Sequence, residues 1–509
     1  MSLKAVSRLE FFKPSEYLPP VSGYSLLPFR FMRLDQSSLL LTNDLGEFTH
    51  LQPDVFERFI KKQLDTTSTA YLDLRTKHFL SDTRSSVQAR IMASKYRTKK
   101  SFLDGFTKLH IFVVSLRCDH SCPYCQVSRQ SEDKVKYDMT VDTAHCAVDL
   151  MLHVPSKNIT CEFQGGEPLL NFSIVQEIIR YAEERNRTIG KIIDFVICTN
   201  ISTLTDDHLE YCRRHKVKIS TSLDGPALLH DINRPFSRGS SHAVVARNIK
   251  RAQEALGHEN VSALMTTTRA SLAYPREIVD EYLRFDFGSI FVRSLSPYGF
   301  ALKTMKTIGY SSEEFIQFYK SVLAYVIEIN RNGRTFSEAY ASLVLTKILT
   351  PYPIGFVDLQ SPAGVGFGVV VYNYDGEIYA SDEARMLAET NDTSFRLGNV
   401  FENSYEEIFF GDRMQAIAAA SCNESLAGCA DCAFQPYCGA DPVHHYATQG
   451  DMFGNRPSSE FCKKNMAIIR HLFDLLRNDD AELQEIFWSW INQSSLQEMK
   501  LLEDPWLSS

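Results

Sequence analysis

Hydrophobic and polar positions between residues 105 and 300 alternate between two patterns. Short apolar stretches of strand length are separated by segments in which apolar residues recur every three or four positions, as in amphipathic helices. The predicted strands are Leu109–Leu116, Asn158–Gln164, Ile192–Thr199, Val217–Ser222, Val261–Thr267 and Ser289–Leu295. The predicted helices are Val141–His153, Ile174–Arg185, Asp206–His215, Ala243–Leu256 and Pro275–Arg284. Six βα units in sequence predict an α/β fold with a parallel sheet, open or curled into a partial barrel, whose chemistry gathers at the carboxyl ends of the strands.

The first hundred residues follow a different pattern and are predicted to form a small α+β domain. Alternating apolar and polar positions predict three short strands at Pro28–Leu34, Ser38–Thr42 and Glu47–Leu51. The predicted helices are residues 52–62, Ser68–Phe79 and Ser86–Tyr96. The basic segment Arg97–Ser101 is predicted to be a linker or an exposed arm.

The chain beyond the βα units is less regular. One more helix is predicted over Ser312–Asn330, a hairpin over Gly366–Tyr379, and helices over Cys462–Leu476 and Asp480–Leu501. These patterns divide the chain into a domain at 1–100, a barrel at 105–335, a cysteine-containing domain at 350–470 and a helical tail at 471–509.

Composition and charge narrow the class of protein. Hydrophobic residues make up 44% and charged residues 23% of the 509 positions, as in ordinary globular proteins. The formal net charge of −8 argues against broad electrostatic binding to nucleic acid. The longest apolar runs are far shorter than the roughly 20 residues that cross a bilayer, and the N-terminal residues lack the apolar core of a secretory signal. We therefore expect a cytoplasmic protein whose partners include neither nucleic acid nor a membrane.

Three cysteines directly after the first barrel strand carry the strongest chemical signal. Cys118, Cys122 and Cys125 form a CxxxCxxC loop. Three thiolates can ligate three irons of a 4Fe–4S cluster and leave the fourth iron open for another ligand. Zinc is the alternative, with His120 as a fourth ligand, but this spacing is unusual for a zinc site. The loop therefore favours an iron–sulfur cluster.

Polar residues also follow the second and fourth strands. Gly165, Gly166 and Glu167 belong to a GGEP string, in which two glycines let the backbone approach a ligand and the carboxylate can meet an ammonium group. Ser222 ends the fourth strand and Arg234 lies on the next loop, a pair that suits a ribose hydroxyl and a carboxylate.

Two further strand ends carry weaker candidates. Asn200 ends the third strand and Leu295 ends the sixth. Each could contact a ligand, or serve respectively as a turn residue and an apolar wall residue.

A second cysteine set lies near the C-terminus, at Cys429, Cys432, Cys438 and Cys462. CxxC followed by two more cysteines can close a four-thiolate site. Spacing alone leaves both zinc and a 4Fe–4S cluster open as occupants.

Over about residues 105–465 these motifs resemble the radical S-adenosylmethionine (SAM) superfamily. The resemblance implies a partial (β/α)6 TIM barrel, in which the open iron chelates S-adenosylmethionine and reductive cleavage gives a 5′-deoxyadenosyl radical. It also implies that Tyr124 lies near the adenine and that the GGEP string meets the methionine amino group. Ser222 and Arg234 match cofactor-holding positions in sulfatase-maturing relatives.

The C-terminal cysteines resemble the SPASM extension of peptide-modifying radical SAM enzymes, whose sites hold auxiliary 4Fe–4S clusters. Cysteines expected for a first auxiliary cluster are replaced by Ser361, Ser381 and Pro442, so only the second auxiliary cluster is expected. Asp382 matches the position of a catalytic base in sulfatase-maturing members. The alternative for Asp382 is a solvated loop carboxylate.

The N-terminal strands and helices resemble a winged-helix peptide-recognition domain, in which an edge strand accepts a leader peptide. The alternative is a packing extension of the barrel. Residues 26–34 and 40–43 resemble the B-type maturase of His-Xaa-Ser peptide systems. The resemblance implies a maturase that crosslinks or epimerises a ribosomally made precursor peptide.

This interpretation also implies partners: a flavodoxin- or ferredoxin-type electron donor and, as a further option, a paired second radical SAM maturase. Two rival functions remain open from the sequence. One is a sulfatase-maturing enzyme that generates formylglycine, and the other is a zinc-binding interaction protein without catalytic activity.

Overall fold

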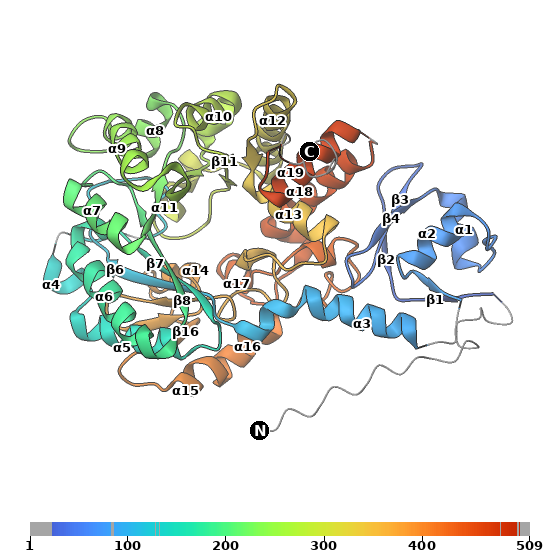
Figure 1. Cartoon of the computed structure of the whole chain (residues 1–509), viewed down its shortest axis with the longest axis horizontal. Helices are drawn as coiled ribbons and strands as arrows, with labels where there is room; N and C mark the ends of the chain where they lie inside the picture. Colours follow the sequence, from blue (N-terminus) through green and yellow to red (C-terminus); the bar gives the residue numbers. More distant parts are fainter. Residues whose placement is uncertain are drawn as a thin grey trace, which may run out of the picture. The chain divides into compact units, whose positions relative to one another are not determined.

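The computed structural model describes residues 23–82, 86–127, 129–131, 133–478, 480–495 and 498. The chain divides into two compact units (Figure 1). The first unit comprises Met1–Ser101, Lys347–Pro353 and Gly428–Tyr437, and the second comprises Phe102–Thr346, Ile354–Ala427 and Cys438–Ser509. None of the helices described is both long and apolar enough to cross a membrane.

The first unit contains an antiparallel sheet in the order β2 (Arg30–Arg33), β3 (Leu39–Thr42) and β4 (Phe48–Leu51), in agreement with the three predicted strands. Its other elements are β1 (Ser25–Leu26), β5 (Leu80–Ser81), α1 (Pro53–Ile60), α2 (Thr69–Thr76) and α3 (Val87–Lys99). Leu41, Phe59 and Leu74 are fully buried members of its apolar core. Among the described strands β2 lies at an edge of this sheet and pairs with β3.

The predicted linker at Arg97–Ser101 is wrong over most of its length, because α3 continues to Lys99. Arg97 and Lys99 lie in the last turn, where their positive charges interact favourably with the negative end of the helix dipole. The basic residues therefore extend the helix rather than interrupt it.

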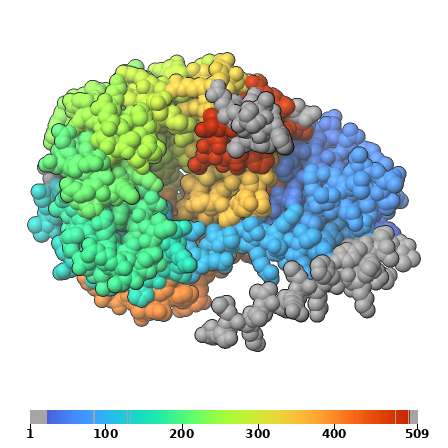
Figure 2. All heavy atoms as spheres, viewed as in Figure 1, coloured from blue at the N-terminus to red at the C-terminus, as the bar shows by residue number. Residues whose placement is uncertain are grey.

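The second unit is built on the predicted partial barrel, which the structure confirms. Six parallel strands follow one another across the sheet in chain order: β6 (Leu109–Ser115), β7 (Asn158–Gly165), β8 (Ile192–Thr199), β9 (Lys218–Ser222), β10 (Val261–Thr266) and β12 (Val292–Arg293). The intervening helices are α5 (Val141–His153), α6 (Phe172–Ile189), α7 (Asp206–His215), α9 (Ser241–Leu256) and α10 (Pro275–Arg284). The helices lie outside the strands (Figure 1), and the barrel segments form one continuous surface, coloured cyan to yellow-green in Figure 2.

The sixth predicted strand is divided in two. β11 (Ser289–Ile290) pairs with β13 (Ser337–Glu338), whereas β12 pairs with β10. The buried carboxylate of Glu338 accepts a hydrogen bond from the Val292 amide at 3.1 Å, which fixes the junction between the two short strands. The two halves of one apolar run therefore pair with different strands. The hydrophobic pattern alone does not predict this division.

The predicted hairpin is confirmed, but it has an additional partner. β14 (Val369–Tyr372) and β15 (Glu377–Tyr379) are antiparallel, and β16 (Arg396–Asn399) follows β15. β14 also pairs in parallel with β6, so the barrel sheet extends to nine strands. The segment that follows the barrel is thus joined to its first strand.

Further helices of the second unit include α11 (Phe300–Ile308), α12 (Ser312–Arg331), α14 (Asp382–Ala388), α17 (Pro442–Gln449), α18 (Glu460–Leu476) and α19 (Ala481–Asn492). The helix predicted at Asp480–Leu501 ends earlier, at Asn492, where Gln493 takes a left-handed conformation with φ of 52°. The last residues of that prediction lie outside the described residues.

Candidate active site

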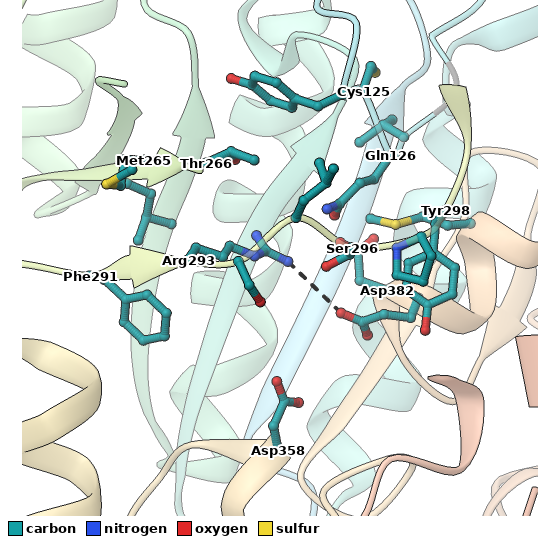
Figure 3. Close-up of a pocket in the computed structure, with 18 of the residues that line it drawn as sticks. Cys125, Gln126, Met265, Thr266, Phe291, Arg293, Ser296, Tyr298, Asp358 and Asp382 are labelled. Carbon is teal, nitrogen blue, oxygen red and sulfur yellow. Dashed lines mark ion pairs between the residues drawn. The ribbon is translucent and has the colours of Figure 1, made fainter. Parts of the chain in front are cut away.

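A cavity of about 840 Å³ lies at the carboxyl ends of the barrel strands. It is lined by almost all the residues predicted for the first cluster and its cofactor: Cys118, Cys122, Tyr124, Cys125, Gly165, Gly166, Asn200, Ser222, Arg234, Leu295 and Asp382. Figure 3 shows part of its wall, with Cys125 and Gln126 on the side opposite Asp358. Residues from six strand ends and from the chain beyond the barrel therefore share one space.

The cysteine loop is held firmly from both sides. Arg117 forms a bidentate ion pair with Asp138, with both N–O distances at 2.7 Å, at the base of the loop. At the other side the Phe300 amide donates to the Cys125 carbonyl at 2.9 Å, and the Thr304 hydroxyl donates to the Pro123 carbonyl at 2.7 Å. The loop is therefore preorganised by β6 below it and by α11 beside it.

The alternative of a zinc site at this loop involves His120. Ligand atoms of Cys118, Asp119 and His120 lie within 4.8 Å of one another, a grouping that could hold a metal ion. Both ring nitrogens of His120 are already engaged, however: Nδ1 pairs with Asp119 and Nε2 pairs with the Ser241 hydroxyl, each at 2.8 Å. His120 is thus better explained as a support of the loop than as a fourth ligand.

The three thiols of the loop suit a metal cluster. Burial raises the pKa of Cys118 well above its usual range and that of Cys122 to about 12. Buried thiols become thiolates readily when a metal ion supplies positive charge. Asn200 donates from Nδ2 to the Sγ of Cys118 at 3.9 Å, a contact of the kind that tunes a cluster through its ligand sulfur. The donor set therefore fits the predicted three-thiolate site.

One buried carboxylate organises the cofactor side of the cavity. Asp224 accepts hydrogen bonds from the Tyr124 hydroxyl at 2.6 Å and from Nε of Arg234 at 3.1 Å, and its other oxygen accepts from the Thr266 amide at 3.1 Å. The Arg234 guanidinium also lies 5.3 Å from the centre of the Tyr124 ring. Among the described residues none bonds the two terminal nitrogens of Arg234, which are thus available to a ligand. Asp224 was not among the residues predicted from the sequence, although it lies only two residues after Ser222.

Gly165 and Gly166 are required by packing against the cysteine loop. A Cβ atom on Gly165 would lie 2.0 Å from the Ser115 carbonyl oxygen, and one on Gly166 would lie 2.2 Å from that of Arg117. A backbone hydrogen bond confirms this close approach, since the Gly166 amide donates to the Ser115 carbonyl at 2.8 Å. The absence of side chains thus lets β7 approach the loop after β6, in addition to exposing backbone to the cavity.

Glu167 is the exception among the predicted cofactor residues, because it does not line the cavity. Its carboxylate is fully buried and accepts from the Thr199 hydroxyl at 2.5 Å, the Leu169 amide at 3.0 Å and the Asn200 amide at 2.8 Å. Burial raises its pKa to about 7. The carboxylate ties the end of β7 to the end of β8, so the part of the GGEP string that faces the cavity is its glycine backbone.

Ser222 and the weaker candidate Leu295 also reach the cavity. The Ser222 side chain lies at the end of β9 and lines the cavity wall. Leu295 lies beyond β12, and its amide donates to the Tyr310 hydroxyl at 2.7 Å. Cys198 on β8, which was not among the predicted site residues, also lines the cavity.

Asp382 is not a solvated loop carboxylate, so that alternative is wrong. It is the first residue of α14, its side chain is 16% exposed, and its Oδ1 lies 3.6 Å from Nε of Arg385. Burial raises its pKa to about 6. The structure places this carboxyl in the cavity wall.

The three positions without cysteine have structural roles of their own. The Ser381 hydroxyl accepts from the Ala384 amide at 3.2 Å and caps α14. Pro442 begins α17, whose cap is Asp441. The Ser361 hydroxyl accepts from the Asn423 amide at 2.9 Å. The two serine side chains thus accept backbone hydrogen bonds, and the proline occupies the first position of a helix.

The C-terminal cysteines are divided between the two compact units. Cys429 and Cys432 lie in the segment Gly428–Tyr437 of the first unit, whose Ala433 carbonyl accepts from the Thr42 hydroxyl at 2.7 Å. Cys438 and Cys462 belong to the second unit, where Asn465 donates to the Sγ of Cys438 at 3.9 Å. Their joint ligation of a cluster remains a prediction from spacing.

Comparisons with known proteins identify the central region. Residues 112–281, about a third of the chain, match the family model described as the radical SAM superfamily. A cysteine-type anaerobic sulfatase-maturating enzyme of Clostridium novyi is 23% identical over 341 residues, which cover 64% of this chain and 84% of that enzyme.

Two solved structures share the fold. The structure of native anSMEcpe with bound AdoMet and Cp18Cys peptide has a TM-score of 0.61 and 18% identity, and the match covers 73% of this chain and 98% of that one. Streptococcus suis SuiB bound to its precursor peptide SuiA has a TM-score of 0.51 and 15% identity, with 86% and 100% covered. The likeness confirms the predicted α/β fold class.

Proposed function

We propose that this chain, which contains a radical SAM domain at residues 112–281, is an enzyme that modifies a ribosomally made precursor peptide by hydrogen-atom abstraction. One observation carries the proposal. The three thiols of the CxxxCxxC loop line the same cavity as Ser222 and Arg234, the two side chains predicted to hold the cofactor. A ligand bound to the loop would therefore share one cavity with the groups that orient it.

The chemistry comes from the bound groups, and the residues provide position and environment. When bound, a 4Fe–4S cluster with an open iron supplies the electron for cleavage of S-adenosylmethionine and so gives the radical that abstracts hydrogen. Cys118, Cys122 and Cys125 would hold the cluster. Arg234 would pair with the cofactor carboxylate through its terminal nitrogens, and Ser222 would hydrogen-bond the ribose. Tyr124, fixed by Asp224, would pack near the adenine.

A peptide substrate is supported by two features. The cavity of about 840 Å³ is larger than a cofactor of this size requires on its own, and its wall continues beyond the barrel to α14 and α17. In the first unit β2 lies at an edge of its sheet among the described residues, a position at which a leader peptide could bind as an added strand. We propose a His-Xaa-Ser type precursor as substrate, with a crosslink or an epimerised residue as product.

Asp382 is proposed as the group that takes up a proton from the substrate. Its carboxyl lines the cavity and lies beside Arg385, and its raised pKa suits a base near neutral pH. The same role would serve a sulfatase-maturing enzyme, which is the second candidate function. A relative of that activity supports it, whereas the loss of the three cysteine positions at Ser361, Ser381 and Pro442 argues against it.

The C-terminal cysteines are proposed to hold a second 4Fe–4S cluster. The spacing of Cys429, Cys432, Cys438 and Cys462 supports this assignment, and zinc is the alternative occupant. We also propose that electrons come from a flavodoxin- or ferredoxin-type donor in the cytoplasm. A paired second maturase is a further proposed partner.

The test is an anaerobic reconstitution followed by turnover with a synthetic His-Xaa-Ser precursor peptide. We expect about eight irons per chain for two cubanes, formation of 5′-deoxyadenosine, and a peptide that either loses two hydrogens or gains deuterium from heavy water. The Cys118→Ala, Cys122→Ala, Cys125→Ala variant should lose both products, and Cys146→Ala on α5 is the matched control. Tetrahedral zinc without sulfide would contradict the proposal, and formylglycine in a sulfatase peptide would favour the second candidate.

A further inference from the structure

Three carboxyl groups from separate segments meet in the cavity wall that lies beyond the barrel. Asp358 comes from the short helix Val357–Leu359, Glu383 from the first turn of α14, and Asp441 from the cap of α17. All three line the cavity. In Figure 3 the Asp358 carboxylate points from its loop into the cavity, toward the side where Arg293 forms its ion pair. We call these three residues the acidic wall.

The acidic wall is only partly neutralised. Arg293 pairs with Glu383 at 4.0 Å, and Lys464 donates to the Ser294 hydroxyl at 3.2 Å. Among the described residues no cationic group forms an ion pair with Asp358 or Asp441, but the charge of Lys464 lowers the pKa of both carboxyls and that of Arg293 lowers the pKa of Asp358. Burial, and then repulsion by the neighbouring carboxyls, raises the pKa of Asp441 to about 8 and that of Asp358 to about 6. The three carboxyls face two cations, Arg293 and Lys464, so one carboxyl has no counter-charge, and a further cation at the wall would favour its ionised form.

An independent observation points to a ligand at the same place. Tyr298 lines the cavity and is only 2% exposed, yet its hydroxyl has no hydrogen-bond partner among the described residues. The charges that raise its pKa are Asp441, Glu383 and Asp358, so the hydroxyl faces the acidic wall. Nε2 of His444, in the first turns of α17, is likewise buried without a partner. Buried polar atoms normally have partners, and such exceptions need an explanation.

The backbone fixes Tyr298 in relation to the cysteine loop. Gly299 follows it with φ of 57°, and a Cβ atom there would lie 2.3 Å from the Gln126 carbonyl oxygen. The amide of the next residue, Phe300, donates a hydrogen bond to the Cys125 carbonyl. The unpartnered hydroxyl is thus carried by the same turn that packs against the loop proposed to hold the cluster.

From these contacts we infer that Asp358, Asp441 and Tyr298 form a subsite that recognises a basic side chain of the substrate peptide, lysine, arginine or protonated histidine. The inference rests on the proposed peptide substrate. A cation with several N–H donors satisfies two carboxylates and a phenol oxygen together. A neutral amide would leave charge unpaired, and an acidic side chain would be repelled.

The test uses full-length, cluster-reconstituted enzyme on a solid support and a randomised heptapeptide library, applied anaerobically with S-adenosylmethionine. Mass spectrometry compares retained and unretained peptides. We expect about tenfold enrichment of a basic residue, the size of effect that one charged hydrogen bond gives. The Asp358→Asn, Asp441→Asn double variant should bring the enrichment to background, and Tyr298→Phe should reduce it severalfold. Asparagine also caps helices, so α17 is expected to form in the variant.

The matched control is Asp207→Asn, Asp286→Asn, which removes the same charge from exposed positions on the second unit and should keep full enrichment. No basic enrichment with the wild type, or equal enrichment with the double variant, overturns the inference. Turnover of the retained peptides separates it from the proposed function. If basic peptides bind but are not modified while 5′-deoxyadenosine forms, the subsite is supported and the proposed peptide-modifying function is contradicted. If peptides are modified without any preference for a basic residue, the proposed function is supported and the subsite is contradicted.

Discussion

The Tyr124 hydroxyl donates a 2.6 Å hydrogen bond to the buried carboxylate of Asp224, which lies one hundred residues later in the chain. The bond joins the cysteine loop to the end of β9. Because Arg234 and the Thr266 amide donate to the same carboxylate, the loop, the proposed cofactor arginine and β10 share one anchor. The positions of these groups are therefore coupled through a single side chain.

Removing the charge of Asp224 should destabilise the protein. In Asp224→Asn the guanidinium of Arg234, whose side chain is 12% exposed, loses its only ion-pair partner among the described residues. Leaving a buried charge uncompensated costs about 3 kcal/mol of unfolding free energy. Chemical denaturation should show this loss, and the KM for S-adenosylmethionine should rise. Asp207→Asn is the exposed control, and equal stability of the two variants would contradict the anchor.

Much of the barrel could be predicted because its signals are local. Strand bounds such as Asn158–Gln164 and Ile192–Thr199 agree with β7 and β8 to within a residue. The parallel pairing of β14 with β6 could not be predicted in this way, because it joins Val369 to Leu109 across most of the barrel sequence. Such pairing depends on tertiary packing and leaves no periodic trace.

The candidate site shows the same division. Motif spacing indicated Cys118 and Arg234, since the carboxyl ends of parallel strands meet at one edge of a sheet. The hydrogen bonds of the buried Glu167 carboxylate and the unpartnered hydroxyl of Tyr298 could not be predicted. Both depend on where the side chains point, and motif spacing does not determine this. Asp224 could have been selected from the sequence, because it lies two residues after the end of a predicted strand, where site residues are expected.

A methyl group at Gly166 should be far more damaging than one at an open glycine. In Gly166→Ala the Cβ would lie 2.2 Å from the Arg117 carbonyl oxygen, so the backbone of the cysteine loop must move. We expect a loss of about 3 kcal/mol or more, as for overpacked sites. Gly288→Ala, with nothing within 4 Å, is the control and should be nearly neutral. Thermal unfolding measures both, and similar melting temperatures would argue against close packing here.

Glu167 should give stability a recognisable pH dependence. Burial raises its folded-state pKa to about 7, above the usual value of 4.5. The folded state therefore holds the proton more tightly, and this stabilising contribution is complete below pH 4.5 and lost as the pH rises through 7. The wild type should lose about 3 kcal/mol relative to Glu167→Gln across that range. Denaturation at several pH values tests this, and parallel curves for the two proteins would show that Glu167 does not titrate there.

The contact of Asn200 with Cys118 should tune the first cluster. Its Nδ2 donates to the Cys118 Sγ at 3.9 Å, and donors to ligand sulfur stabilise the more negative, reduced form of a cluster. Asn200→Ala should therefore shift the reduction potential to more negative values and slow formation of 5′-deoxyadenosine. Potentiometric titration followed by electron paramagnetic resonance measures the shift. Ser202→Ala, which removes a contact to Asp119 rather than to sulfur, is the control, and a potential equal to that of the wild type in Asn200→Ala would exclude the tuning role.

Asp382 should control peptide turnover without controlling cofactor cleavage. A base must be ionised to accept a proton, and burial raises its pKa to about 6, so formation of modified peptide should rise as the pH passes through 6. In Asp382→Asn this rise should disappear and the product rate should fall by about 100-fold, the lower limit of general-base contributions, while 5′-deoxyadenosine still forms. Glu389→Gln, which alters the other carboxylate paired with Arg385, is the matched control. If Asp382→Asn kept the pH profile of the wild type, the proton would have to leave through another group of the cavity.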